Sequence, residues 1–137
     1  MIFRVTATES TIDLISELLP VHGPLLFHQS GGCCDGSAPM CFARTDFRVG
    51  SRDVLLGEIS DQPFFMAEDQ FEYWEHTQLI IDVVQGRGGM FSVEGPTGKR
   101  FLTRSRVFTD EEAAMLQKEP PKRACNVSNI EGLKRTS

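Results

Sequence analysis

The stretch DVLLGEISDQPFFMAEDQFEYWEHTQLIIDVV, residues 53–84, decides the expected fold. Its apolar pattern predicts strands at Asp53–Ile59 and Phe64–Met66, and a short helix at Glu68–Trp74 with acidic residues in its first turn. Period-two alternation over residues 79–84 predicts another strand with one well-buried face. Strands come in runs rather than in strict alternation with helices. That order predicts a small α+β domain with a mostly antiparallel or mixed sheet and two or three short helices.

The segments before this stretch add further elements. A helix is expected at about Thr11–Leu19, capped by Ser10 and stopped by Pro20. The apolar run Gly23–His28 predicts a buried strand, and Phe42–Val49 predicts a second one.

The segments after it predict a hairpin and a helix. Phe91–Val93 is expected to pair with a return strand at Lys99–Phe108 across a glycine-rich turn. Thr109 and Glu112 match a capping box, which predicts a helix that ends before Pro120.

Length and composition bound the class of protein. A chain of 137 residues with 40% hydrophobic and 24% charged residues fits one globular domain with a modest core. We expect residues 1–118 to form that single domain. Apolar periodicity ends at Glu119, and residues 119–137, with four Lys or Arg and two Glu, are expected to form a flexible C-terminal tail.

The charge balance and the first residues bear on partners and compartment. A net charge of −5 argues against nucleic-acid binding, because phosphate contacts need a basic face. The N-terminus lacks the pattern of a signal peptide, and no stretch is long enough to span a bilayer. We therefore expect a cytoplasmic protein that binds neither nucleic acid nor membrane. Its four cysteines are then expected to be reduced, metal-bound or catalytic rather than paired in disulfides.

The segment Gly31–Cys41 is the candidate site for chemistry. It holds Cys33, Cys34 and Cys41, which are candidate metal ligands because thiolates favour zinc, copper(I), iron or iron–sulfur units. Cys33 and Cys34 are also the candidates for a catalytic or redox thiol. The alternative is that these cysteines are buried and act as small apolar residues.

Other residues of this segment support a site. Gly31, Gly32 and Gly36 allow a tight turn that presents the thiols. Asp35 and His28 are supporting candidates that could orient a thiol or join a metal.

A second candidate surface is basic. Arg104 and Arg106 fall on one side of the expected strand and could bind an anion or an acidic partner, although a solvated face also explains them.

Several motifs of the chain resemble a bacterial family, the domain of unknown function 779. They are His28–Ser37, Pro39–Cys41, Val54–Glu58, Gln70–Trp74, Thr77–Leu79 and Phe101–Arg106. Members of that family are often encoded beside NAD-dependent aldehyde or acetaldehyde dehydrogenases. The resemblance therefore implies such a dehydrogenase as a partner.

A more distant likeness concerns the fold. Gly31–Cys33 is similar to the Gly-Gly-Cys-Ser-Gly loop of HesB-like A-type iron–sulfur carriers. The likeness implies a HesB-like fold with Cys33 at the position of the first cysteine ligand. The carriers' C-terminal Cys-Gly-Cys motif is absent from this chain.

These observations favour three functions. The first is a non-enzymatic accessory protein of an aldehyde dehydrogenase, which uses the cysteine loop to bind a metal, a cluster or the partner. The second is a small thiol-dependent redox enzyme in which Asp35 or His28 tunes Cys33 or Cys34. The third is a structural interaction module, and a homodimer is expected in that case.

Overall fold

The computed structural model describes residues 3–29, 39–46, 48–50, 52–86, 92–119, 122–123 and 134–135. The helices are α1 (Glu9–His22), α2 (Glu68–Trp74) and α3 (Asp110–Gln117), with short 3-10 turns η1 (Arg44–Asp46) and η2 (Gly95–Thr97). The strands are β1 (Val5–Ala7), β2 (Leu25–Gln29), β3 (Met40–Ala43), β4 (Arg48–Val49), β5 (Asp53–Ile59), β6 (Gln62–Ala67), β7 (Thr77–Gln85), β8 (Lys99–Val107), β9 (Lys122–Arg123) and β10 (Lys134–Arg135). The expected α+β class is confirmed.

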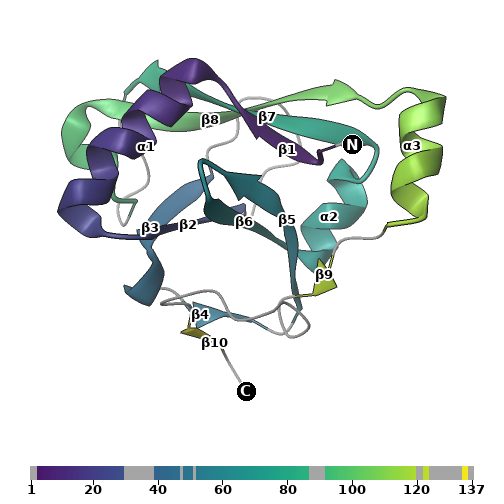
Figure 1. Cartoon of the computed structure of the whole chain (residues 1–137), viewed down its shortest axis with the longest axis horizontal. Coiled ribbons are helices and arrows are strands. Elements are labelled where there is room, and N and C mark those ends of the chain that lie inside the picture. The colour runs from purple at the N-terminus through teal and green to yellow at the C-terminus, as the bar shows by residue number, and fades with distance from the viewer. Residues whose placement is uncertain are drawn as a thin grey trace.

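The strands form two main sheets. One has the order β1-β7-β8, with β1 parallel and β8 antiparallel to β7. The other has the order β3-β2-β6-β5-β9, in which only the central β2–β6 pair is parallel. Figure 1 shows α1 beside one end of these sheets and α2 and α3 near the other. β4 and β10 form a separate parallel pair.

The main core lies between the two sheets. The Phe27 ring of β2 meets the Phe101 ring of β8 edge-on, with 5.0 Å between centroids, and stacks at 6.0 Å on Phe64 of β6. Buried side chains of α1, among them Ile15, and Trp74 of α2 belong to the same cluster. Burial of these large apolar side chains holds the two sheets together.

A second, smaller core covers the outer face of the five-stranded sheet. Leu26 of β2, Phe65 of β6 and Val49 of β4 are its buried members. Because both faces of β2 are covered, every residue from Leu25 to Gln29 is buried. This double coverage places the side chain of His28 inside the protein rather than at its surface.

The expectation for the first helix was wrong at both ends. α1 begins at Glu9 after the cap Thr8, whose hydroxyl accepts from the Thr11 N–H, and it continues past Pro20 to His22. The Thr8 N–H bonds to a β7 carbonyl, which ends β1 and starts the helix two residues earlier than expected. Pro20 lies on the exposed side of the last turn, so its missing N–H leaves only a solvent-facing carbonyl unpaired.

The strand expected at Phe42–Val49 is interrupted. β3 ends at Ala43, and the turn η1 separates it from β4. The cause is buried Arg44, whose Nε donates to the Leu25 carbonyl at 3.1 Å and whose Nη2 donates to Gln62 Oε1 at 3.0 Å. These bonds draw the chain back over the start of β2, so the strand cannot continue.

The prediction that the return strand pairs with Phe91–Val93 was also wrong. β8 pairs with β7 over its whole length, from Lys99 opposite Gln85 to Val107 opposite Thr77. Phe91 lies outside the described residues, and Val93 is not in a strand but donates its N–H to the Cys41 carbonyl. Pairing with β7 extends over nine residues, and Phe101 and Leu102 of β8 are buried.

Other expectations are confirmed by the structure. The strand Asp53–Ile59 and the helix Glu68–Trp74 have the expected bounds, and Thr109 and Glu112 form the expected capping box at α3. Among the helices of the described residues, none combines the length and the apolar character needed to cross a membrane. Within residues 119–137, β9 pairs with β5 and β10 pairs with β4.

Candidate functional site

The cysteine loop is the connection of a β-hairpin. β2 and β3 pair antiparallel from Leu25 opposite Ala43 to His28 opposite Met40. The connection therefore leaves the sheet after Gln29. Its candidate residues Gly31, Gly32, Cys33, Cys34, Asp35 and Gly36 lie outside the described residues. The structure describes the base of this loop, which is the end of β2 and the start of β3.

His28 stands at that base and pairs with a carboxylate. Its Nε2 lies 2.9 Å from Asp53 Oδ1, and only 6% of His28 is exposed. The other carboxylate oxygen, Asp53 Oδ2, accepts from the Gly50 N–H at 2.7 Å. A carboxylate fixed in this way orients an imidazole and selects which ring nitrogen carries its proton. Any bond from His28 to a thiol or a metal therefore uses Nδ1.

Asp53 is a candidate site residue that the sequence analysis did not identify. In the sequence it is simply the first residue of a strand, 25 positions after His28. The two meet because β6 lies between β2 and β5 and the register brings their side chains to one face. No local pattern carries that information.

Cys41 is placed apart from His28. It pairs with Phe27 and belongs with it to the core between the sheets, whereas His28 pairs with Met40 on the opposite face. Cys41 is 0% exposed, and its pKa is raised well above the ordinary value by burial and by the nearby charge of Glu94. Cys41 therefore matches the alternative interpretation, a buried cysteine acting as a small apolar residue.

The described residues do not by themselves form a metal site. Within the ranges that the structure covers, no three His, Cys, Asp or Glu side chains are grouped so as to hold an ion. A metal at this hairpin would need donors from the loop, so the prediction for Cys33, Cys34 and Asp35 remains a prediction.

The returning arm of the hairpin is fixed by a buried polar cluster. Ser92 Oγ accepts from the Cys41 N–H at 2.8 Å, and the Val93 N–H bonds to the Cys41 carbonyl at 2.9 Å. Glu94 is 1% exposed, and burial raises its pKa. Its Oε1 has no hydrogen-bond partner within the described part of the chain. Burial therefore disfavours the charged form of this carboxyl group relative to a carboxyl group in water.

The outgoing arm is fixed by a bond between the sheets. Thr103 Oγ1 on β8 donates to Gln29 Oε1 at 2.9 Å, and both side chains are buried. Gln29 is the last residue of β2, so this bond anchors the chain directly before the cysteine loop.

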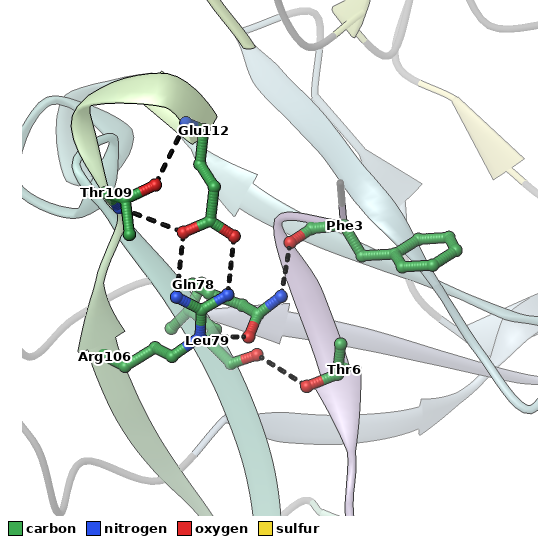
Figure 2. Close-up of polar contacts among 7 residues, drawn as sticks. All are labelled: Phe3, Thr6, Gln78, Leu79, Arg106, Thr109 and Glu112. Atoms are coloured by element: carbon green, nitrogen blue, oxygen red, sulfur yellow. Dashed lines mark hydrogen bonds and ion pairs between the residues drawn. The ribbon is translucent and has the colours of Figure 1, made fainter. Parts of the chain in front are cut away.

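The basic candidates face carboxylates of the same chain. Arg104 Nε donates to Asp82 Oδ2 at 2.8 Å. Arg106 binds Glu112 through Nη1 and Nη2 at 3.0 and 2.8 Å, and its Nε donates to Gln78 Oε1, as Figure 2 shows. The guanidinium of Arg106 lowers the pKa of Glu112 to about 2. Both arginines thus neutralise internal carboxylates, and an external anion would compete with those pairs.

Comparison with known proteins assigns the family. The family model called Domain of unknown function (DUF779) matches residues 14–107, more than half of the chain. The chain belongs to the DUF779 family. The part matched by DUF779 includes the β2–β3 hairpin, Asp53 and Thr103, but not β1 or α3. No curated protein and no solved structure matches the chain, so the HesB-like likeness stays a prediction.

Proposed function

We propose that this DUF779 protein is a non-enzymatic accessory protein of an NAD-dependent aldehyde or acetaldehyde dehydrogenase, with a thiolate-bound metal at the β2–β3 loop. The observation that supports a metal is the buried His28–Asp53 pair at the base of that loop. Histidines that bind metals commonly give their other ring nitrogen to a carboxylate, which fixes the ring and raises its basicity. Family membership supports the choice of partner.

The proposed ligands are the thiolates of Cys33 and Cys34 and the Nδ1 of His28, with Asp35 as a further candidate. Zinc, iron or an iron–sulfur unit fits such a donor set. Cys41 is left out, because its side chain belongs to the core on the other face of the sheet. A bound metal would hold the loop in one conformation through its thiolate and imidazole ligands.

Elemental analysis of the full chain, purified without oxygen, tests the metal. We expect close to one equivalent of metal per chain, with loss in Cys33→Ser and Cys34→Ser and weaker retention in Asp53→Asn. Cys41→Ala is the matched control and should retain the metal. Equal metal content in the unaltered chain and all four variants, or no metal in the unaltered chain, contradicts the proposal.

Copurification tests the partner. The full chain should coelute with the aldehyde dehydrogenase of the same genome when the two purified proteins are mixed and separated by gel filtration. Separate elution of the two proteins, each at about 10 µM, would exclude a complex with a dissociation constant below about 10 µM. The outcome of this experiment does not affect the test of the metal.

The same pair of residues also favours a second candidate function, a thiol-dependent redox enzyme. An imidazole oriented by a carboxylate is the arrangement that activates cysteine nucleophiles. Alkylation of the full chain by iodoacetamide as a function of pH distinguishes it. One loop cysteine should then react with an apparent pKa well below about 8.5, and His28→Ala should return it to ordinary reactivity. Uniform, ordinary reactivity of the loop cysteines excludes this candidate.

A further inference from the structure

Strand β7 has an open edge over its last residues. β1 pairs only with Leu79–Ile81, after which the chain turns at Thr8 into α1. β7 continues to Gln85, still paired with β8 on its other side. The β1 side of residues 83–85 therefore has no strand beside it within the described residues.

The hydrogen bonds show which backbone groups point to this open side. The β7–β8 ladder is bracketed by the bonds Phe108 N–H to His76 C=O and Gly86 N–H to Gly98 C=O. The direction of the backbone N–H and C=O groups alternates along a strand. The groups of the even-numbered residues of β7 therefore point toward β8, and those of the odd-numbered residues point toward β1. Bonds from Leu79 N–H to the Arg4 carbonyl and from Thr8 N–H to the Ile81 carbonyl confirm the second set.

By the same alternation, Val83 and Gln85 direct their backbone groups to the open side. The Val83 N–H is taken by the side chain of Asp82. The Val83 carbonyl and both backbone groups of Gln85 have no hydrogen-bond partner among the residues that the structure describes. Such groups are available to an added strand.

A groove of about 260 Å³ lies between this edge and α1. Its α1 wall consists of Ser10, Asp13, Leu14 and Glu17, and its other wall consists of Val83, Val84, Gln85 and Lys99. Figure 1 shows α1 beside the end of β7 that is farther from α3. The groove shares no residue with the β2–β3 site.

The charges of the groove select the occupant. The exposed carboxylates of Asp13 and Glu17 lie one helical turn apart on the same wall, and Lys99 is the one cationic side chain among the lining residues. Valines and Leu14 supply the apolar part. We infer that this groove binds an extended peptide segment with alternating apolar and basic side chains. The peptide backbone pairs with Val83 and Gln85, and a lysine or arginine meets Asp13 and Glu17.

NMR spectroscopy of the ¹⁵N-labelled full chain tests this inference. The probe is an acetylated pentapeptide of alternating valine and lysine, and the control peptide carries glutamate in place of lysine. We expect the lysine peptide to shift the amide signals of Ser10–Glu17 and of Gln85, with an affinity that falls as salt rises. Equal effects of both peptides, shifts confined to other regions, or no shift at millimolar peptide overturns the inference.

Two variants separate the backbone and charge contributions. Gln85→Pro removes the outward N–H without touching a β7–β8 bond, because the ladder bonds are those of Val84 and Gly86. It should weaken peptide binding about tenfold, whereas Gln85→Ala, which keeps the N–H, should not. Asp13→Asn with Glu17→Gln should weaken binding by about tenfold as well, and Glu111→Gln on α3 is the control.

Self-association is the competing occupant. If a second copy of the chain fills the groove, the Gln85 amide will show concentration-dependent shifts without peptide, and sedimentation will show a dimer that Gln85→Pro abolishes. That result would overturn the peptide assignment. A monomer whose groove signals respond only to the lysine peptide supports it.

Discussion

His28 and Asp53 belong to strands separated by β6, yet His28 Nε2 and Asp53 Oδ1 lie 2.9 Å apart on the outer face of the five-stranded sheet. Both side chains are largely buried, and the Gly50 N–H holds the second carboxylate oxygen. This pair fixes the base of the cysteine loop, and the function proposed for the loop depends on it.

The first prediction concerns the stability that this pair contributes. Asp53→Ala should lower the free energy of unfolding by about 1–3 kcal/mol, because it removes the acceptor of a buried polar hydrogen atom and of the Gly50 N–H. Urea unfolding followed by circular dichroism measures the change. Arg52→Ala, at an exposed neighbouring position, is the control and should cost less than about 0.5 kcal/mol. A change at Asp53 no larger than that of the control would show that the pair is structurally neutral.

The second prediction concerns the bond between the sheets at Thr103. Thr103→Val keeps the shape of the side chain but removes the donor to Gln29 Oε1, and it should destabilise the protein by on the order of 1 kcal/mol. Thr103→Ser keeps the hydroxyl and should keep the hydrogen bond. Thermal and urea unfolding of the two variants make the comparison. If valine is tolerated better than serine, packing rather than the hydrogen bond governs this position.

The third prediction concerns Glu94 and pH. Burial raises its pKa above the ordinary value of 4.5, so the folded state favours the neutral carboxyl group. The associated stability is fully present below pH 4.5 and is lost as pH rises through the raised pKa. The stability of the unaltered chain relative to Glu94→Gln should therefore fall with rising pH across that window. A constant difference between the two proteins, measured by urea unfolding at several pH values, would contradict a raised pKa of Glu94.

The fourth prediction concerns Glu112 and has the opposite sign. The guanidinium of Arg106 and the Thr109 N–H hold the pKa of Glu112 at about 2, below the ordinary 4.5. The contribution of this carboxylate is present above pH 4.5 and is lost as pH falls toward 2. Hydrogen exchange at the α3 amides should therefore speed up on acidification, relative to the amides of α1. In Glu112→Gln, which keeps an oxygen for the Thr109 N–H but loses the charge that pairs with Arg106, the α3 amides should already exchange faster at neutral pH. Identical exchange in both proteins would show that the charge of Glu112 contributes nothing to α3.

Local signals in the sequence determined several elements by themselves. The apolar run that forms β5 and the acidic start of α2 are read from neighbouring residues, as is the Thr109–Glu112 capping box. Each depends on interactions within a few residues of chain, so the sequence contains all the information needed. The same holds for the family, whose motifs are contiguous stretches.

Tertiary structure decided the rest, because the deciding contacts join residues far apart in the chain. Arg44 breaks the expected strand by bonding to Gln62 and β2, and the β2–β3 register sends Cys41 to the opposite face from His28. Asp53 of β5 is the partner of His28 of β2 because both strands pair with β6, one on each side of it. Side chains alternate between the faces of a strand, so a shift of one residue in register would have moved Cys41 or Asp53 to the other face of the sheet.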